Sequence, residues 1–122
     1  PDYFFLNNRT AGFTDASKAA GFTQPTMSNG AAYSDLDNDG DLDLVVNRVN
    51  STAGVYRNET TTGNGLSIIL EGEGQNRMGI GTTVYLYAGG FLQCLYQSPV
   101  RGFMSSVSPV LHAGLGSARI ID

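Results

Sequence analysis

The segment 35–43 reads DLDNDGDLD and places an aspartate at every second position. Short, mostly apolar stretches flank it: residues 31–33 read AAY, and residues 44–46 read LVV. Such runs favour strands, while Gly40 permits a sharp turn inside the acidic segment. We therefore expect residues 35–43, called the acidic loop below, to connect two strands of a sheet. A helical setting is excluded by the flanking pattern.

The acidic loop also accounts for the charge of the whole chain. The net charge is -4, from 11 acidic and 7 basic residues, and removing the five loop aspartates from the 11 leaves six acids against seven bases. The remaining scaffold is nearly neutral and has no basic patch, so we expect no nucleic-acid partner. With 41% hydrophobic residues, 16 glycines and no long apolar run, the sequence predicts an all-β chain without a membrane span.

The acidic loop has the chemistry of a calcium site. Oxygen ligands recur at alternate positions, as hard cations require, whereas no cluster of cysteine and histidine suggests zinc. Val46 stands where an EF-hand would supply its bidentate glutamate, so an EF-hand is excluded. Leu42 is expected to point inward, and the side chains of Asn38 and Asp41 outward. A solvated acidic turn is the alternative, but five close carboxylates repel one another without a cation. We expect Ca²⁺ to be held by Asp35, Asp37, Asp39, the backbone carbonyl of Asp41, and Asp43.

The composition changes near residues 60–65, which predicts two parts, 1–62 and 63–122. Residues 4–7 match residues 55–58 at a 51-residue offset, a period typical of β repeats. At most one short helix is expected, over residues 15–20. In the second part, residues 82–88 and 91–97 flank Gly89 and Gly90, which predicts a β-hairpin. Further short strands are expected around 66–70, 104–110 and 110–115, with a last one beginning at Ile120.

Several of these motifs resemble known families. Residues 4–8 (FFLNN), 12–15 (GFTD), 19–21 (AAG) and 34–44 (SDLDNDGDLDL) resemble the FG-GAP (VCBS-type) calcium repeat of β-propellers. Residues 75–84 (QNRMGIGTTV), 102–105 (GFMS) and 111–116 (LHAGLG) resemble the ASPIC/UnbV domain of bacterial secreted proteins and of cartilage acidic protein. Met78 and Ala113 depart from the expected pattern, and the resemblance implies a closing strand beyond Asp122.

The resemblance implies a propeller-blade-like repeat followed by a small antiparallel β-sandwich-like domain. It also implies calcium binding by the loop aspartates, while one blade is too little for a closed propeller. Asn8, Asn50 and Asn58 each begin an N-x-[ST] sequon and are possible glycosylation sites.

No catalytic residue is predicted. His112 has no nucleophile elbow and no acidic partner in the sequence, and the glycine loops around residues 72–81 lack complete phosphate-binding motifs. Glu71 and Glu73 are interpreted as solvent-exposed. Tyr85 and Tyr87 share one face of their strand and, with Tyr96, could stack against sugars, although core or cross-strand packing is the simpler interpretation.

The combined hypothesis is a non-catalytic, calcium-binding extracellular β module used for binding or adhesion. Its ligand would be a protein or a carbohydrate at the cell surface, and the chain would be secreted, either extracellular or periplasmic. Self-assembly is the first alternative: open strand edges could add strands from neighbouring copies and build a fibre or surface layer. An accessory part of a secreted metal-dependent hydrolase is the second alternative.

Overall fold

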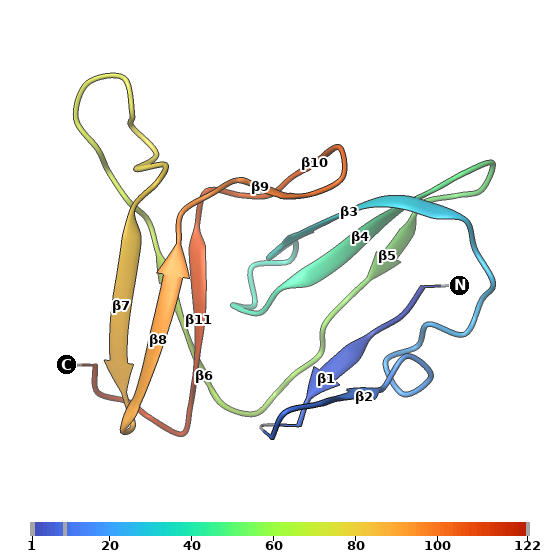
Figure 1. The fold of residues 1–122 in the computed structure, drawn as a ribbon, viewed down its shortest axis with the longest axis horizontal. Coiled ribbons are helices and arrows are strands. Elements are labelled where there is room, and N and C mark those ends of the chain that lie inside the picture. Colours follow the sequence, from blue (N-terminus) through green and yellow to red (C-terminus); the bar gives the residue numbers. More distant parts are fainter. Residues whose placement is uncertain (1, 9, 122) are drawn as a thin grey trace.

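The computed structural model describes residues 2–8 and 10–121, and within this part it is built from strands, turns and loops without a helix. The all-β expectation is therefore confirmed. Figure 1 shows the eleven strands in two groups, one from each half of the chain. Their bounds are β1 Phe5–Asn7, β2 Phe13–Asp15, β3 Ser28–Ser34, β4 Asp43–Arg48, β5 Gly54–Tyr56, β6 Asn64–Ile68, β7 Thr83–Ala88, β8 Phe91–Tyr96, β9 Val100–Gly102, β10 Ser105–Ser106 and β11 Leu111–Gly116.

The first group contains two antiparallel sheets. β1 pairs with β2, and β3, β4 and β5 form a three-stranded sheet with β4 in the centre. β-branched residues at Val45 and Val46 suit the central strand. Between β2 and β3 the backbone turns where the short helix is expected: the Ala20 N–H donates to Ala16 O, and Gly21 ends the turn at a φ of +85°.

The second group contains three two-stranded antiparallel sheets, β7–β8, β6–β11 and β9–β10. The predicted hairpin is confirmed, because β7 and β8 pair from Thr83 opposite Tyr96 to Ala88 opposite Phe91. Gly89 and Gly90 form its turn with φ values of +57° and +80°. The expected last strand is reduced to an antiparallel bridge between Ile121 and Ala88.

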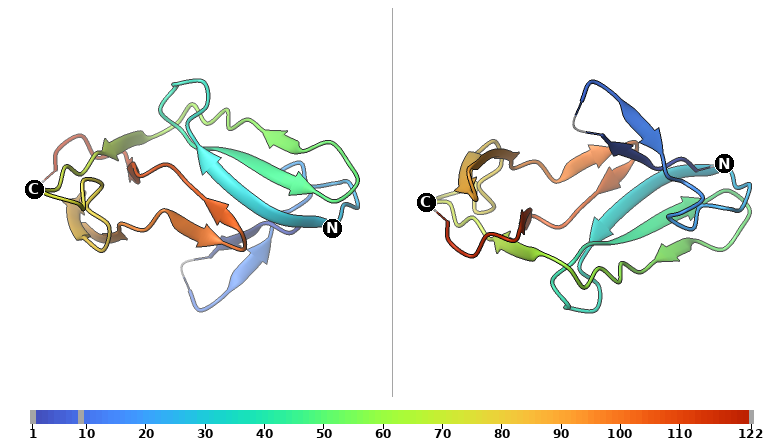
Figure 2. Two further views of the ribbon diagram at one scale, coloured as in Figure 1. Left: turned by 90° about the horizontal axis from the view of Figure 1, so that it is seen from above. Right: turned by 90° about the horizontal axis from the view of Figure 1, so that it is seen from below.

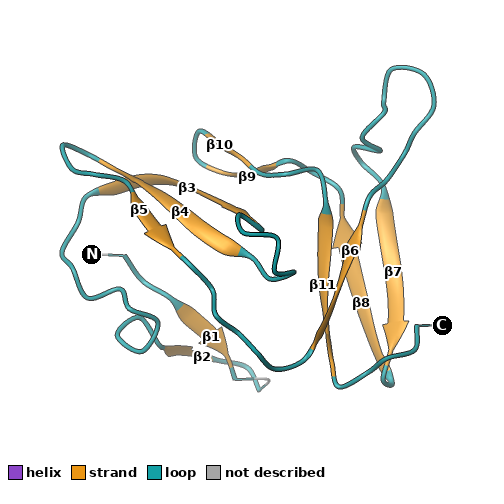
Figure 3. Ribbon diagram, turned by 180° about the vertical axis from the view of Figure 1, so that it is seen from behind, coloured by secondary structure: helices purple, strands orange, loops and turns teal. Residues whose placement is uncertain are grey.

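The two groups meet where the β9–β10 hairpin leans on β3. Both β9 and β10 contact β3, and the Ala31 N–H donates to the Ser105 hydroxyl at 3.2 Å. The views from above and below show this hairpin reaching from the second group to the first (Figure 2). Seen from behind, the loop after β3 lies on the side of its sheet that faces β6 and β11 (Figure 3).

Few apolar side chains are buried in the described part of the chain: Val46, Leu86, Ala88, Leu111 and Ala113. The alternation in β7 places Leu86 and Ala88 inward and leaves Tyr85 and Tyr87 61% and 52% exposed. Packing of these two tyrosines in the core is therefore contradicted, whereas cross-strand packing against β8 stays a prediction. The most buried large side chain is polar: Gln97, only 2% exposed, follows β8.

Candidate metal centre

The acidic loop connects β3 to β4, as its flanking strands predict. Its shape is held by hydrogen bonds from its own backbone: Asp35 accepts from the N–H groups of Asp39 and Gly40, and Asp39 accepts from that of Asp41. Asn38 and Gly40 have φ values of +59° and +95°, so the chain can turn tightly here. The alternation of short polar residues around a glycine therefore folds back on itself without help from a helix.

The turn brings three of the predicted ligands together. Asp35, Asp37 and Asp39 each offer a carboxylate oxygen, and these atoms lie within 4.8 Å of one another. Asp35 is half-buried, while the other two side chains are exposed. Clustered carboxylate oxygens suit a hard cation such as Ca²⁺, which takes six to eight oxygen ligands. Residues and donor type therefore fit the expected metal.

A basic side chain already reaches this cluster. Arg57, which follows β5, forms an ion pair of 3.0 Å from its Nε to an Asp37 carboxylate oxygen and a longer one of 3.6 Å to Glu59. The guanidinium relieves part of the repulsion among the aspartates. Because the Arg57 side chain is mostly exposed, this ion pair contributes little to stability.

Asp43, the last residue of the acidic loop, is buried and only 3% exposed. One of its carboxylate oxygens accepts from the Leu36 N–H and the other from the Asn58 N–H, both at 2.9 Å. These hydrogen bonds hold the pKa of Asp43 below its ordinary value. Both carboxylate oxygens of Asp43 accept hydrogen bonds from backbone N–H groups. Asp43 does not belong to the cluster of Asp35, Asp37 and Asp39.

Asp41 differs from the sequence-based expectation, because its side chain turns toward the protein. One carboxylate oxygen accepts from the Thr60 N–H at 3.2 Å, and the other is buried without a hydrogen-bond partner. Loss of hydration, and next the negative charge of Asp39, raise the pKa of Asp41. An unpaired carboxylate oxygen at this point favours a nearby cation or hydrogen-bond donor.

A polar cleft of about 620 Å³ opens beside the acidic loop, between it and the β6–β11 sheet. Asp39 and Asp41 line one wall, and Ser67 and His112 line the other. His112 lies opposite Ser67 in the register, and its Nδ1 is 3.2 Å from the serine hydroxyl. That His112 lies across this cleft from Asp39 and Asp41 could not be predicted, because β11 and the acidic loop are far apart in the sequence.

The three sequons lie in different surroundings. Asn8 and Asn58 each accept a hydrogen bond from the hydroxyl of the threonine two residues on. Asn8 is exposed, while Asn58 is half-buried beside the acidic loop. Asn50 is exposed in the turn between β4 and β5, with a φ of +54°. Glu71 and Glu73 are exposed, as expected.

Comparison with known families assigns the second half of the chain. The model of the ASPIC and UnbV family matches residues 72–122. The match finds an ASPIC/UnbV domain in this segment, which is less than half of the chain. The ASPIC/UnbV domain contains β7 to β11, whereas the acidic loop and β6, the partner strand of β11, lie outside the matched residues. The FG-GAP-type repeat in the first half stays a prediction.

No curated protein and no solved structure matches the chain. The described residues include no helix that is long and apolar enough to cross a membrane.

Proposed function

We propose that the chain is a non-catalytic, calcium-binding β module that works outside the cell in binding or adhesion. The observation that carries the proposal is the cluster of Asp35, Asp37 and Asp39, whose carboxylate oxygens lie within 4.8 Å of one another in the loop between β3 and β4. Calcium is the cation best suited to such a set of oxygen ligands. The predicted FG-GAP-type repeat supports the same reading.

Asp35, Asp37 and Asp39 would hold the ion, and the carbonyl of Asp41 would be a further ligand. Bound Ca²⁺ would supply positive charge at a point where carboxylates now repel one another. Asp43 has a different part in this proposal, because its hydrogen bonds to Leu36 and Asn58 tie the loop to the segment after β5. The loop would thereby stiffen the edge of the cleft beside it.

Isothermal titration calorimetry of the whole chain with CaCl₂ tests this proposal. We expect one binding event, which Asp37→Ala abolishes or weakens strongly. Glu73→Ala is the matched control, because it also removes an exposed carboxylate but lies far along the chain from the loop. Extracellular calcium modules often bind at about 10⁻⁴ to 10⁻³ M, so the titration must extend into the millimolar range. Equal binding by wild type and Asp37→Ala would refute the proposed site.

Extracellular placement is part of the same proposal. Calcium is abundant outside cells, and the sequons at Asn8, Asn50 and Asn58 would be used in a glycosylating secretory pathway. Mass spectrometry of the protein secreted from a glycosylating host, before and after enzymatic removal of N-linked glycans, reports their use. An unshifted mass would remove glycosylation from the proposal without affecting the calcium site.

Self-assembly is the second candidate, and the sheet topology favours it. Each of the four two-stranded sheets and the three-stranded sheet has two edge strands in the described part of the chain. Unpaired edges can accept a strand from a neighbouring copy. Light scattering with and without Ca²⁺ separates the candidates, because a monodisperse monomer contradicts assembly and growing polymers contradict a simple ligand-binding module.

A further inference from the structure

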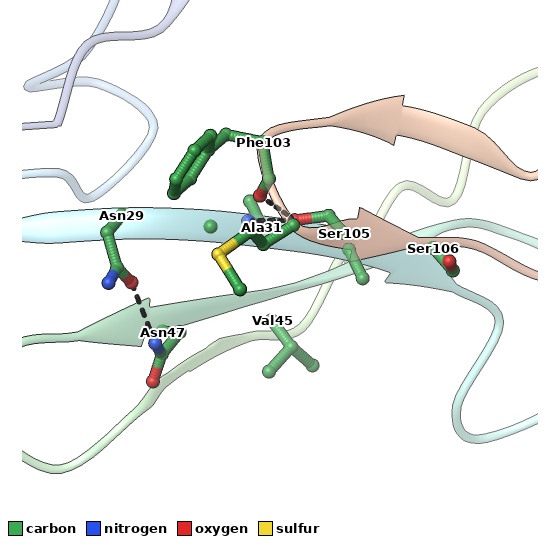
Figure 4. Close-up of a pocket in the computed structure, with 10 residues that line it drawn as sticks. Asn29, Ala31, Val45, Asn47, Phe103, Ser105 and Ser106 are labelled. Carbon is green, nitrogen blue, oxygen red and sulfur yellow. Dashed lines mark hydrogen bonds between the residues drawn. The ribbon is translucent and has the colours of Figure 1, made fainter.

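A second pocket lies where the two halves of the chain meet. It differs in chemistry from the cleft beside the acidic loop. It has a volume of about 440 Å³, within the roughly 300–1,000 Å³ typical of small-molecule sites. β3 and β4 form its floor, and the turn between β9 and β10 forms one side (Figure 4). None of the described residues that line it is charged. The residues that line this pocket come from the ASPIC/UnbV domain and from the preceding half of the chain.

Two asparagines present both kinds of hydrogen-bonding group to this pocket. The Asn47 side-chain amide donates to the Asn29 side-chain oxygen at 2.7 Å, as Figure 4 shows. This bond leaves the amide nitrogen of Asn29 and the side-chain oxygen of Asn47 without protein partners among the described residues. One donor group and one acceptor are thus held side by side. Exchanging the oxygen and nitrogen assignments of both amides would preserve this pairing.

The opposite side of the pocket is apolar and exposed. Phe103 and Met104 form the β9–β10 turn, with 71% and 90% of their surfaces exposed. Met104 has a φ of +47°, a strained conformation for a residue other than glycine. The Ser105 hydroxyl fixes the turn by donating to Phe103 O at 2.9 Å and accepting from the Ala31 N–H. These hydrogen bonds fix the backbone of the turn, and the exposed Phe103 ring lies beside the pocket (Figure 4).

We propose that this pocket binds a neutral saccharide unit. A pyranose ring has an apolar C–H face, which packs on an exposed aromatic ring, and hydroxyl groups that both donate and accept hydrogen bonds. The pocket supplies the ring of Phe103, the paired amides of Asn29 and Asn47, and no charge. A phosphate or a uronic acid would lack a basic partner, and an amine would lack an acidic one. The site shares no lining residue with the acidic loop and needs no metal.

Nuclear magnetic resonance titration of the ¹⁵N-labelled chain tests the proposal. The probes are the methyl glycosides of glucose, galactose, mannose and N-acetylglucosamine at millimolar concentration. We expect at least one to shift the side-chain amide signals of Asn29 and Asn47 and the backbone signal of Ala31. Phe103→Ala should then weaken binding about tenfold, equivalent to about 1.4 kcal/mol. Asn29→Ala should also weaken it.

Phe91→Ala is the matched control, because Phe91 is 70% exposed against 71% for Phe103 but lies at the start of β8. Folding of both variants is checked by the dispersion of the amide spectrum, and binding by Phe91→Ala should equal that of wild type. The proposal is overturned if no glycoside shifts these signals, if Phe91→Ala weakens binding as much as Phe103→Ala, or if the shifts map to Tyr85 and Tyr87.

Calcium separates this inference from the proposed function. Saccharide binding should persist in excess chelator, since the pocket contains no metal ligand. Loss of binding in chelator would overturn the inference and move the saccharide to the cleft beside the acidic loop. A failed calcium titration with intact saccharide binding would refute the proposed function alone.

Discussion

Replacing Gln97 by leucine should destabilise the protein more than any other single change of similar size on β8 or next to it. Gln97 is 2% exposed, and its side-chain amide donates to two backbone carbonyls, those of Met78 at 3.0 Å and Pro109 at 2.6 Å. Leucine has a similar volume and no donor, so both carbonyl oxygens would lose this partner in a part-buried place. An unsatisfied buried acceptor costs about 1–3 kcal/mol, and the greater apolarity of leucine recovers part of this. We expect the free energy of unfolding to fall by about 2–4 kcal/mol.

Gln93→Leu is the matched control on the same hairpin. Gln93 is half-buried and donates a single hydrogen bond, to Gly114 O at 2.7 Å, in a place that water can reach. Its replacement should cost less than about 1 kcal/mol. Urea unfolding followed by tyrosine fluorescence measures both, since the chain has six tyrosines and no tryptophan. If Gln97→Leu is no less stable than Gln93→Leu, the two buried hydrogen bonds do not hold these loops together.

Three further changes test other parts of the structure. Gly90→Ala should destabilise the β7–β8 hairpin by about 1–2 kcal/mol in a urea titration, because Gly90 has a φ of +80°, whereas Gly114→Ala, in open space without a positive φ, should be nearly neutral. Asp15 has a lowered pKa because the Ser17 hydroxyl and N–H donate to it, so its contribution to stability is present at neutral pH and lost as the pH falls below about 4. Asp15→Asn should therefore flatten this acid limb in pH-dependent thermal unfolding, and an unchanged limb would contradict the assignment. Free Ca²⁺ at about 100 times its Kd should stabilise the wild type by about 2.7 kcal/mol, a gain that chelator or Asp37→Ala should remove in the same thermal assay.

Local features of the fold could be predicted from the sequence because nearby residues determine them. Gly89 and Gly90 between two alternating apolar runs specify the β7–β8 hairpin, and the observed positive φ values are the physical reason. The acidic loop is specified in the same way, since its aspartates accept hydrogen bonds from its own backbone. The short helix expected over residues 15–20 is limited to turns, because too few residues are present to offset helix nucleation.

Contacts between distant segments could not be predicted. Gln97 looks like an ordinary polar residue at a strand end, and only packing against Met78 and Pro109 makes it the most buried large side chain. The position of Ser105 against Ala31 likewise depends on how the β9–β10 hairpin meets β3. The expectation that the Asp41 side chain points outward was wrong for the same reason. Thr60, whose N–H donates a hydrogen bond to Asp41, belongs to another segment.

The uneven distribution of buried apolar residues has a consequence for how the molecule opens. Of the five buried apolar residues in the described part of the chain, Val46 lies on β4, and the other four lie on β7 and β11. Two-stranded sheets such as β1–β2 are marginal in isolation, so their amide hydrogens should exchange with solvent through small local openings. The amides of β7 and β11 should exchange only through much larger ones. Hydrogen exchange would thus show slowly exchanging amides in the ASPIC/UnbV domain. The first half of the chain would exchange faster, through local openings that leave the second half folded.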